Sequence, residues 1–122
     1  NEEGLQVRFD RETGSRLKEY YKKNNRYDGL YREYDPSTGE LVYEATYEFG
    51  RLNGKAKSLV RDNRFDYWET STYANGRQTG PFESRYVKND RVRETGTYRN
   101  GHRTGRWKRY DINGKLEMEW EE

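Results

Sequence analysis

The sequence contains no cysteine, which excludes disulfide bonds, thiolate metal sites and catalysis by a thiol nucleophile. Strongly apolar residues are also scarce, because Leu, Ile, Val and Phe together account for 17 of the 122 positions. That share lies below the roughly 20% under which disorder becomes a serious alternative. No run approaches the ~18 consecutive apolar residues of a membrane-spanning helix, and no signal-peptide hydrophobic segment is present.

Neither sign of charge dominates, since 24 Lys and Arg face 22 Asp and Glu for a formal net charge of +2. Disordered chains usually combine low hydrophobicity with high net charge, so this balance argues for a folded protein. It also argues against a nucleic-acid partner, which usually requires a basic excess or a basic stripe. The 12 Tyr and 3 Trp bury much area while their polar tips stay in water, which favours a thin, half-hydrated sheet.

Glycines recur at a nearly constant interval along the whole chain. The intervals are 25, 25, 26 and 25 residues, and the glycines are Gly4, Gly29, Gly54, Gly80 and Gly105. So regular a period is typical of a repeat protein. The sequence therefore predicts a single repeat domain over residues 1–122, with four full units and a shortened fifth that begin near these glycines.

Every unit has the same internal order of elements. A short strand is expected after the glycine, as at Leu30–Tyr34 and Arg106–Tyr110. A polar turn such as Asp35–Gly39 follows, where Asp bonds its own backbone and Gly supplies a positive φ. A return strand comes next and is clearest at Leu41–Tyr47. The best helical alternative, Ser15–Lys23, falls on the return strand of the first unit and is predicted to be a strand.

A second turn closes each unit with the spelling Tyr-x-x-Gly-x-x-x-Gly. Two copies carry Asn-Gly, at Asn75–Gly76 and Asn100–Gly101, which is the strongest short-range signal for a hairpin. In the first unit Asn25 stands in place of the glycine, and Asn is the next best residue for a left-handed backbone.

The fold class follows from these turns and strands. We predict an all-β protein, an elongated single-layer antiparallel β-meander of tandem hairpin repeats with a period of about 25 residues. About ten strands at a spacing of ~4.8 Å would give a sheet roughly 45 Å long. Six glycines are interpreted as structural turn positions and not as phosphate loops, because no helix follows them: Gly29, Gly54, Gly76, Gly80, Gly101 and Gly105.

The repeat resembles the MORN repeat, and more closely its bacterial variant form. The best matches are Gly29-Leu-Tyr31-Arg-Glu-Tyr34, Gly105-Arg-Trp107-Lys-Arg-Tyr110 and Tyr98-Arg-Asn-Gly101-His-Arg-Thr-Gly105. The resemblance covers essentially the whole chain. It departs from the pattern in the third unit, where Ala56 and Leu59 replace the aromatic pair, and in the first, where Gln6 replaces the first aromatic residue.

The resemblance implies a scaffold that mediates interactions, because MORN repeats form elongated single sheets of hairpins and some are claimed to bind phospholipids. Bacterial variant-repeat proteins are often labelled antitoxin-like or immunity-like, and others are exported. A bacterial cytoplasmic protein and an exported protein that has lost its signal both fit. The lipid-kinase name that some relatives carry is rejected, because the repeats fill this chain and leave no room for a kinase.

The recurring aromatic residues have two interpretations. Packing into ladders along the sheet explains most of them. A single-layer sheet has a second, open face, however, and Tyr, Trp and Arg left there are the usual hot-spot residues of protein interfaces. Arg32, Arg85 and Arg106 alternate with the aromatics. The candidate binding residues on this concave face are Tyr31, Tyr34, Tyr73, Tyr98, Arg103, Trp107, Arg109 and Tyr110.

No residue pattern points to catalysis, a cofactor or a metal. His102 is the only histidine and has no second ligand type at a suitable spacing, so we interpret it as a turn residue. No nucleophile-elbow motif supports a Ser-His-Asp triad. The many carboxylates are read as cross-strand partners of Lys and Arg. The protein is therefore expected not to be an enzyme.

Two functions are carried forward. The first is a scaffold that binds another protein, either a toxin or an assembly partner, and for which the double substitution Trp107→Ala, Tyr110→Ala is expected to keep the fold and abolish capture. The second is binding of anionic lipid headgroups or glycans at a cell surface, where Arg99 would contribute. Acidic residues at Glu117–Glu122 would protect the last edge strand, whereas an open first edge would allow a homodimer by strand pairing.

Overall fold

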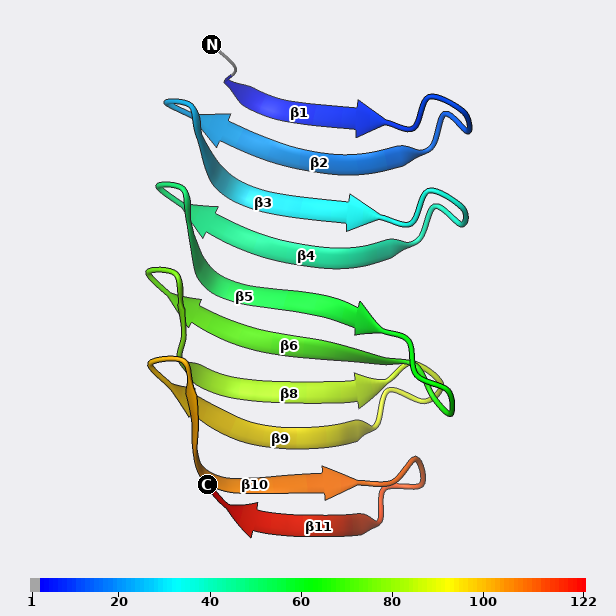
Figure 1. Cartoon of the computed structure of the whole chain (residues 1–122), viewed down its shortest axis with the longest axis vertical. Coiled ribbons are helices and arrows are strands. Elements are labelled where there is room, and N and C mark those ends of the chain that lie inside the picture. Colours follow the sequence, from blue (N-terminus) through cyan, green and yellow to red (C-terminus); the bar gives the residue numbers. More distant parts are fainter. Residues whose placement is uncertain (1–2) are drawn as a thin grey trace.

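The computed structural model describes residues 3–122, which form eleven strands and no helix, and hence no helix that could cross a membrane. All the strands belong to one open sheet, shown in Figure 1. The strands are β1 (Gly4–Phe9), β2 (Arg16–Lys23), β3 (Arg26–Tyr34), β4 (Leu41–Glu48), β5 (Arg51–Val60), β6 (Tyr67–Ala74), β7 (Arg77–Gln78), β8 (Gly80–Tyr86), β9 (Val92–Arg99), β10 (His102–Tyr110) and β11 (Leu116–Glu121).

The strand order follows the chain. Each strand pairs antiparallel with the next one, except that the two-residue β7 pairs only with β6, whose other residues pair with β8. β1 and β11 therefore form the two edges of the sheet, at opposite ends of the molecule (Figure 1). The predicted all-β meander of tandem hairpins is confirmed, including the strand predicted for Ser15–Lys23, which the structure assigns to Arg16–Lys23.

The hairpin turns at one end of the strands share one backbone conformation. Both central residues of each turn have a positive φ, as at Asn75 and Gly76 with 51° and 84°. This is the type I′ geometry, whose twist matches that of the flanking strands. Asn25 has a φ of 64°, as its place in the repeat predicted. Phe49 takes the first position of its turn with a φ of 51° and shows that the register of the repeat fixes the conformation even without Asn.

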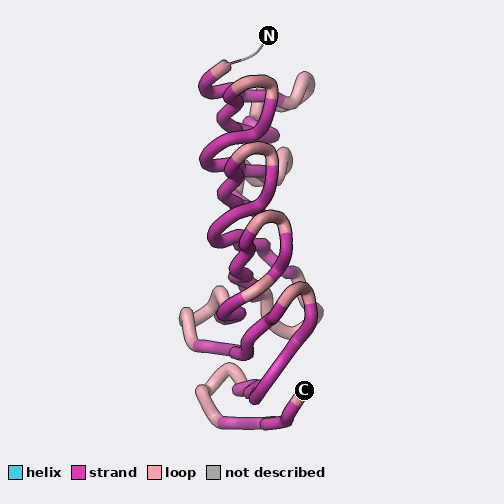
Figure 2. Tube along the Cα trace, turned by 90° about the vertical axis from the view of Figure 1, so that its left-hand side faces the viewer, coloured by secondary structure: helices cyan, strands magenta, loops and turns pink. Residues whose placement is uncertain are grey.

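The sheet bends where the periodic glycines interrupt its long strands. Gly29 has a φ of 105°, and the rings of Tyr27 and Tyr31 on either side of it lie only 5.3 Å apart. In a straight strand two residues four positions apart would be separated by about 13 Å, at ~3.3 Å per residue. The strand therefore folds over at the glycine, and repetition of this bend curls the sheet into a trough, seen from the side as successive coils in Figure 2.

The concave face of this trough carries the core. One residue from each strand after β1, except the short β7, contributes to its floor, and the row runs Tyr20, Tyr31, Ala45, Ala56, Ser71, Phe82, Gly96, Trp107 and Trp120. Most of these side chains are buried, although the sheet has a single layer. Burial is achieved because neighbouring units stack their aromatic rings side by side, in place of a second layer.

Charged residues of the convex face are paired with each other. In register across four strands, Glu19, Arg32, Glu44 and Lys57 alternate in sign. Arg32 Nε lies 2.7 Å from Glu44 Oε2, and Lys57 lies over the ring of Trp68 at 4.7 Å. Further along the same face, Glu83 pairs with Arg85, and Arg106 and Lys108 both pair with Glu119. The central row of the convex face thus satisfies its own charges.

The third unit departs from its neighbours at the end of its hairpin. The other hairpins of this edge contain a register shift before the turn, as between Arg8 and Phe9, whereas Val60 pairs with Tyr67 without one. The loop over residues 61–66 instead extends toward the end of β8, where Val87 N donates to Asp66 O at 3.0 Å. This loop forms one wall of a cleft described below.

Candidate functional site in the concave trough

The first part of the trough is filled by tyrosines. Tyr20, Tyr27, Tyr31 and Tyr47 contact each other with ring centroids 5.2 to 6.0 Å apart. Tyr31 is only 6% exposed, and its hydroxyl donates to Glu33 at 2.6 Å. Burial and this hydrogen bond raise the pKa of the Tyr31 hydroxyl. Tyr31, a predicted binding residue, therefore serves mainly as core.

A hollow opens in the middle of the trough, where the floor residues Ala56 and Ser71 are small. Its volume is about 270 Å³. The walls combine aromatic rings with polar groups and comprise Tyr43, Ser58, Glu69, Tyr73, Gln78, Phe82, Tyr98 and Arg103. Three of the predicted binding residues, Tyr73, Tyr98 and Arg103, meet here, although they come from β6, β9 and β10. We call this space the central hollow.

Glu69 is the most unusual group of the central hollow. Its carboxylate has no hydrogen bond or ion pair within 4 Å among residues 3–122. Burial raises the pKa of Glu69, and the more distant charges of Arg93 and Arg103 only partly oppose this effect. A half-buried carboxylate without a close partner loses part of its hydration, and a cation or a hydrogen-bond donor from outside would compensate for that loss.

Arg103 closes the far side of the central hollow. Its guanidinium lies 4.3 Å from the centroid of the Trp107 ring and donates to the Tyr98 hydroxyl at 3.4 Å. It is also 4.0 Å from Glu94. The structure therefore brings together Tyr98, Arg103 and Trp107, as predicted, but Trp107 is fully buried and lies beneath the other two. Full burial of Trp107 argues against the expectation that the fold would be little affected by its replacement, because this side chain is the centre of the C-terminal core.

Other predicted binding residues lie on the opposite side of the sheet. The Tyr34 hydroxyl donates to Glu19, which belongs to the convex row. Tyr110 follows the concave residue Arg109 and by strand alternation faces the convex side. Arg32, Arg85 and Arg106 are also convex, in the ion pairs given above. The sheet does not bring these five residues to the concave face.

Two buried polar residues, Glu94 and Ser84, lie at the trough floor between the central hollow and the C-terminal units. Glu94 is 3% exposed and accepts two hydrogen bonds from Arg109, at 2.8 and 3.2 Å. Its cross-strand neighbour Ser84 is fully buried, and the Ser84 hydroxyl has no hydrogen-bond partner among the described residues. The Glu94–Arg109 pair thus fixes the predicted binding residue Arg109 in place.

Replacement of Ser84 by alanine should stabilise the protein. A buried hydroxyl without a partner costs about 1–3 kcal/mol of desolvation that alanine does not suffer. We therefore expect Ser84→Ala to raise the free energy of unfolding by about 1 kcal/mol, measured by urea denaturation. Ser58→Ala, in the half-exposed lining of the hollow, should change it by less than about 0.5 kcal/mol. Destabilisation by Ser84→Ala would mean that this hydroxyl has a structural partner.

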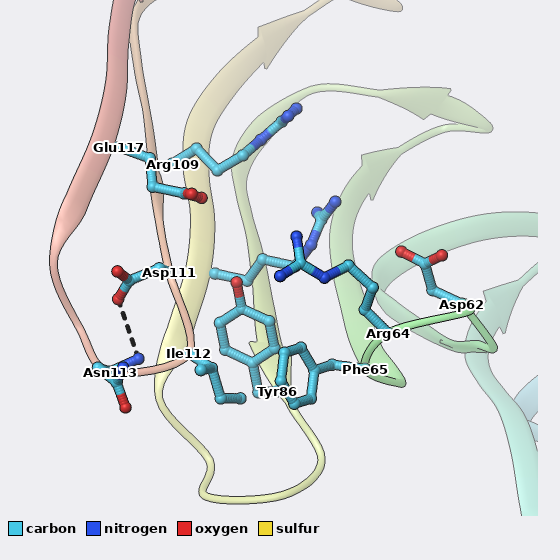
Figure 3. Close-up of a pocket in the computed structure, with 10 residues that line it drawn as sticks. Asp62, Arg64, Phe65, Tyr86, Arg109, Asp111, Ile112, Asn113 and Glu117 are labelled. Atoms are coloured by element: carbon cyan, nitrogen blue, oxygen red, sulfur yellow. Dashed lines mark hydrogen bonds between the residues drawn. The ribbon is translucent and has the colours of Figure 1, made fainter.

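A second cavity, the charged cleft, lies where the loop over residues 61–66 meets the turn between β10 and β11. Its volume is about 370 Å³. Figure 3 shows Arg64 reaching from the loop toward Tyr86, with Asp111 and Glu117 on the other side. The remaining lining residues are Asp62, Phe65, Arg93, Arg109, Ile112 and Asn113. Sequence reasoning identified only Arg109 among them.

Sequence reasoning also missed Glu69, Arg64 and Arg93. Arg93 is the extra residue of the bulge at the start of β9, where Ser84 pairs with Glu94 but Arg85 pairs with Val92. It lies 3.9 Å over the Tyr67 ring, on the concave side. One signal was available, because the only 26-residue interval between the periodic glycines runs from Gly54 to Gly80 and contains the aberrant loop.

The residues considered for metal or catalytic chemistry are dispersed. His102 is exposed beside the hairpin turn at the start of β10. Within residues 3–122 no group of three or more His, Asp or Glu side chains could hold a metal ion. The groups that the trough presents are charges, hydroxyl groups and aromatic faces.

The tyrosines predict unfolding at alkaline pH. Burial raises the pKa of the Tyr43 hydroxyl to about 12, whereas an unfolded tyrosine titrates at about 10. The folded state favours the neutral hydroxyl, so the contribution of Tyr43 to stability is fully present below the pKa of the unfolded state. It is lost as pH rises through the pKa of the folded state. We expect the wild-type Tm to fall steeply from about pH 10 to 12, and less steeply for Tyr43→Phe. Equal slopes in thermal scans would show that Tyr43 is not protected from ionisation.

Comparison with known proteins identifies no relative: no family model, no curated protein and no solved structure matches the chain. The resemblance to MORN repeats therefore stays a prediction from the repeat pattern.

Proposed function

We propose that the protein is a non-catalytic binding module that captures a partner protein in its concave trough. One observation carries this proposal. Charges along the central row of the convex face are paired with each other, whereas Glu69, Arg64 and Arg93 on the concave side have no ion-pair partner among residues 3–122. A surface that keeps charges unpaired next to aromatic rings is suited to complementary recognition.

The open shape of the cavities, more than their size, favours a protein over a small molecule as the partner. The central hollow and the charged cleft have volumes of about 270 and 370 Å³ and are both open to solvent. Sites for drug-sized ligands usually enclose about 300–1,000 Å³ and bury most of the ligand. Two shallow cavities along one trough could each receive a different side chain of the same partner protein. The resemblance to bacterial variant repeats supports a toxin or an assembly partner as the first candidates.

A glycan is the second candidate, favoured by the composition of the central hollow. Tyr43, Tyr73 and Tyr98 offer ring faces, and Ser58 and Gln78 offer hydrogen bonds beside them. Sugar binding of this kind would depend on stacking and would change little with salt. Capture that relies on Glu69 and the free arginines should weaken strongly as salt increases, because these charges are partly exposed.

The test is affinity capture from the source cells with two matched variants. Glu69→Gln removes the unpaired concave charge, and Glu83→Gln removes a convex carboxylate from a strand of the same sheet. We expect one protein to be enriched by the wild type and by Glu83→Gln, and at least about tenfold less by Glu69→Gln. Equal enrichment by both variants would place the interface elsewhere. Circular dichroism of the three proteins controls for the fold.

A further inference from the structure

We infer that the charged cleft binds a carboxylate that is carried beside an apolar side chain, as in an acidic segment of the partner. The inference goes beyond partner capture in naming the chemical group that is recognised, and it rests on the proposed function because the cleft opens on the concave side.

Two guanidinium groups of the cleft have no hydrogen-bond or ion-pair partner within 4 Å among the described residues, although the charge of Arg93 acts on Glu69 at longer range. Neither Arg64 nor Arg93 makes a hydrogen bond or ion pair with a described residue. Arg93 is nevertheless held in place, because it lies 3.9 Å over the Tyr67 ring. Arg109, the third arginine, is occupied by Glu94 at 2.8 Å. The cleft therefore lines one cavity with two donor groups, and guanidinium binds carboxylate through parallel N–H bonds.

The floor of the cleft is apolar. Tyr86 is 8% exposed, and its hydroxyl already donates to the Tyr110 carbonyl oxygen at 2.7 Å, so that mainly its ring faces the cavity. Phe65 packs against this ring edge-on, with centroids 5.9 Å apart, and Ile112 lines the same space. Figure 3 shows Phe65 and Tyr86 side by side below Arg64. An aromatic or aliphatic group next to the anion would be buried here.

The wall opposite the loop is acidic and limits which anion can bind. Asp111 and Glu117 face Arg64 across the cleft in Figure 3. Asp111 accepts backbone hydrogen bonds from Asn113 and Lys115, both at 2.9 Å, so it is held in this position. A phosphate dianion would be repelled by these carboxylates more strongly than a singly charged carboxylate. Together with Asp62, these carboxylates offset the charges of Arg64 and Arg93, so the cleft disfavours a dianion more than a singly charged carboxylate held directly by the two guanidinium groups.

The walls are fixed before any ligand binds. Asn89 Nδ2 donates to the Ile112 carbonyl oxygen at 2.8 Å, and an Arg91 guanidinium donates to the Asn113 carbonyl oxygen. On the other side the Val87 N–H donates to the Asp66 carbonyl oxygen at 3.0 Å. Little ordering is required when a ligand enters such a cleft, which favours binding even of a small group.

The experiment uses the purified full chain and small probes. N-acetylphenylalanine carries a carboxylate beside a phenyl ring, N-acetylphenylalaninamide is its neutral counterpart, and phenyl phosphate carries the dianion. Binding is followed by NMR through the Arg Nε–H signals and backbone amides near Tyr86. The variants are Arg64→Gln, in an exposed loop, and the control Arg77→Gln, in the strand β7 at the other end of β6.

We expect N-acetylphenylalanine to shift the signals of Arg64 and Arg93 and to bind at least about tenfold more tightly than the amide. Arg64→Gln is expected to weaken binding of N-acetylphenylalanine by a similar factor, and Arg77→Gln is expected to leave its affinity unchanged. Equal binding of acid and amide, no binding of the acid, no effect of Arg64→Gln, or tighter binding of phenyl phosphate would each overturn the inference. These titrations need no partner, so they can fail while capture through Glu69 succeeds, and the reverse also holds.

Discussion

Replacement of Gly96 by alanine is expected to lower the free energy of unfolding by about 3 kcal/mol, although it adds a single methyl group. An added Cβ would lie 2.1 Å from Cδ2 and Cε2 of Trp107. Trp107 is fully buried and contacts Phe82, Tyr98 and Trp120, so its ring has nowhere to move. Urea denaturation followed by tryptophan fluorescence measures the effect.

Gly101→Ala is the matched control for this substitution. Gly101 has a φ of 86° and no atom within 4 Å of an added Cβ, so alanine there would strain only the backbone. Such strain amounts to about 1–2 kcal/mol. A loss at Gly96 no greater than that at Gly101 would mean that Trp107 is not packed against β9 as described.

Trp107→Ala is the second substitution with a large expected effect, a loss of about 3–5 kcal/mol. The indole is fully buried, donates from its ring nitrogen to the Thr104 carbonyl oxygen at 3.2 Å and carries the guanidinium of Arg103 on its face. Trp120→Ala, in the edge strand β11, should cost clearly less, because Trp120 is only partly buried. Equal losses of unfolding free energy in the two variants would mean that Trp107 contributes no more to the C-terminal core than a partly buried edge residue.

The two predictions are coupled, which allows a stricter test. In a Trp107→Ala background the ring that an alanine at position 96 would clash with is absent, so Gly96→Ala should cost little there. Residues in contact show interaction energies of about 0.5–3 kcal/mol in double-mutant cycles, whereas independent sites add. Additive losses in the double variant would contradict the contact between Gly96 and Trp107.

The architecture could be predicted from the sequence because its signals are local. Asn-Gly pairs and regularly spaced glycines set the conformation of a turn or bend from within a few residues. Asn25 illustrates this point, since its positive φ follows from its place in the repeat alone. The curvature of the trough was harder to predict from the sequence, because the bend at Gly29 depends on contacts between the rings of Tyr27 and Tyr31 on either side of it.

The candidate site was predicted only in part, and strand alternation explains why. Tyr31 and Tyr34 are three positions apart, as are Trp107 and Tyr110, so the members of each pair face opposite sides of the sheet. One face could therefore never hold all of them. Tyr73, Tyr98 and Arg103 do meet around the central hollow.

The free charges were beyond sequence reasoning for a different reason. Arg93 reaches the concave side through a bulge, and Arg64 through a loop that departs from the repeat, and neither irregularity has a reliable local signature. Glu69 is one of many carboxylates in the sequence. Only the positions of its neighbours, the small residues Ala56 and Ser71 in particular, leave it in a hollow without a partner.

The central claim, that partners bind on the concave side, can be tested with two adjacent residues. Thr70 belongs to the convex row and Ser71 to the trough floor, so they point to opposite sides of the same strand. A photo-crosslinking phenylalanine analogue placed at either position reports which face contacts the partner in the source cells. We expect the partner to be crosslinked from position 71 and not from position 70. Crosslinking from position 70 alone would contradict the account.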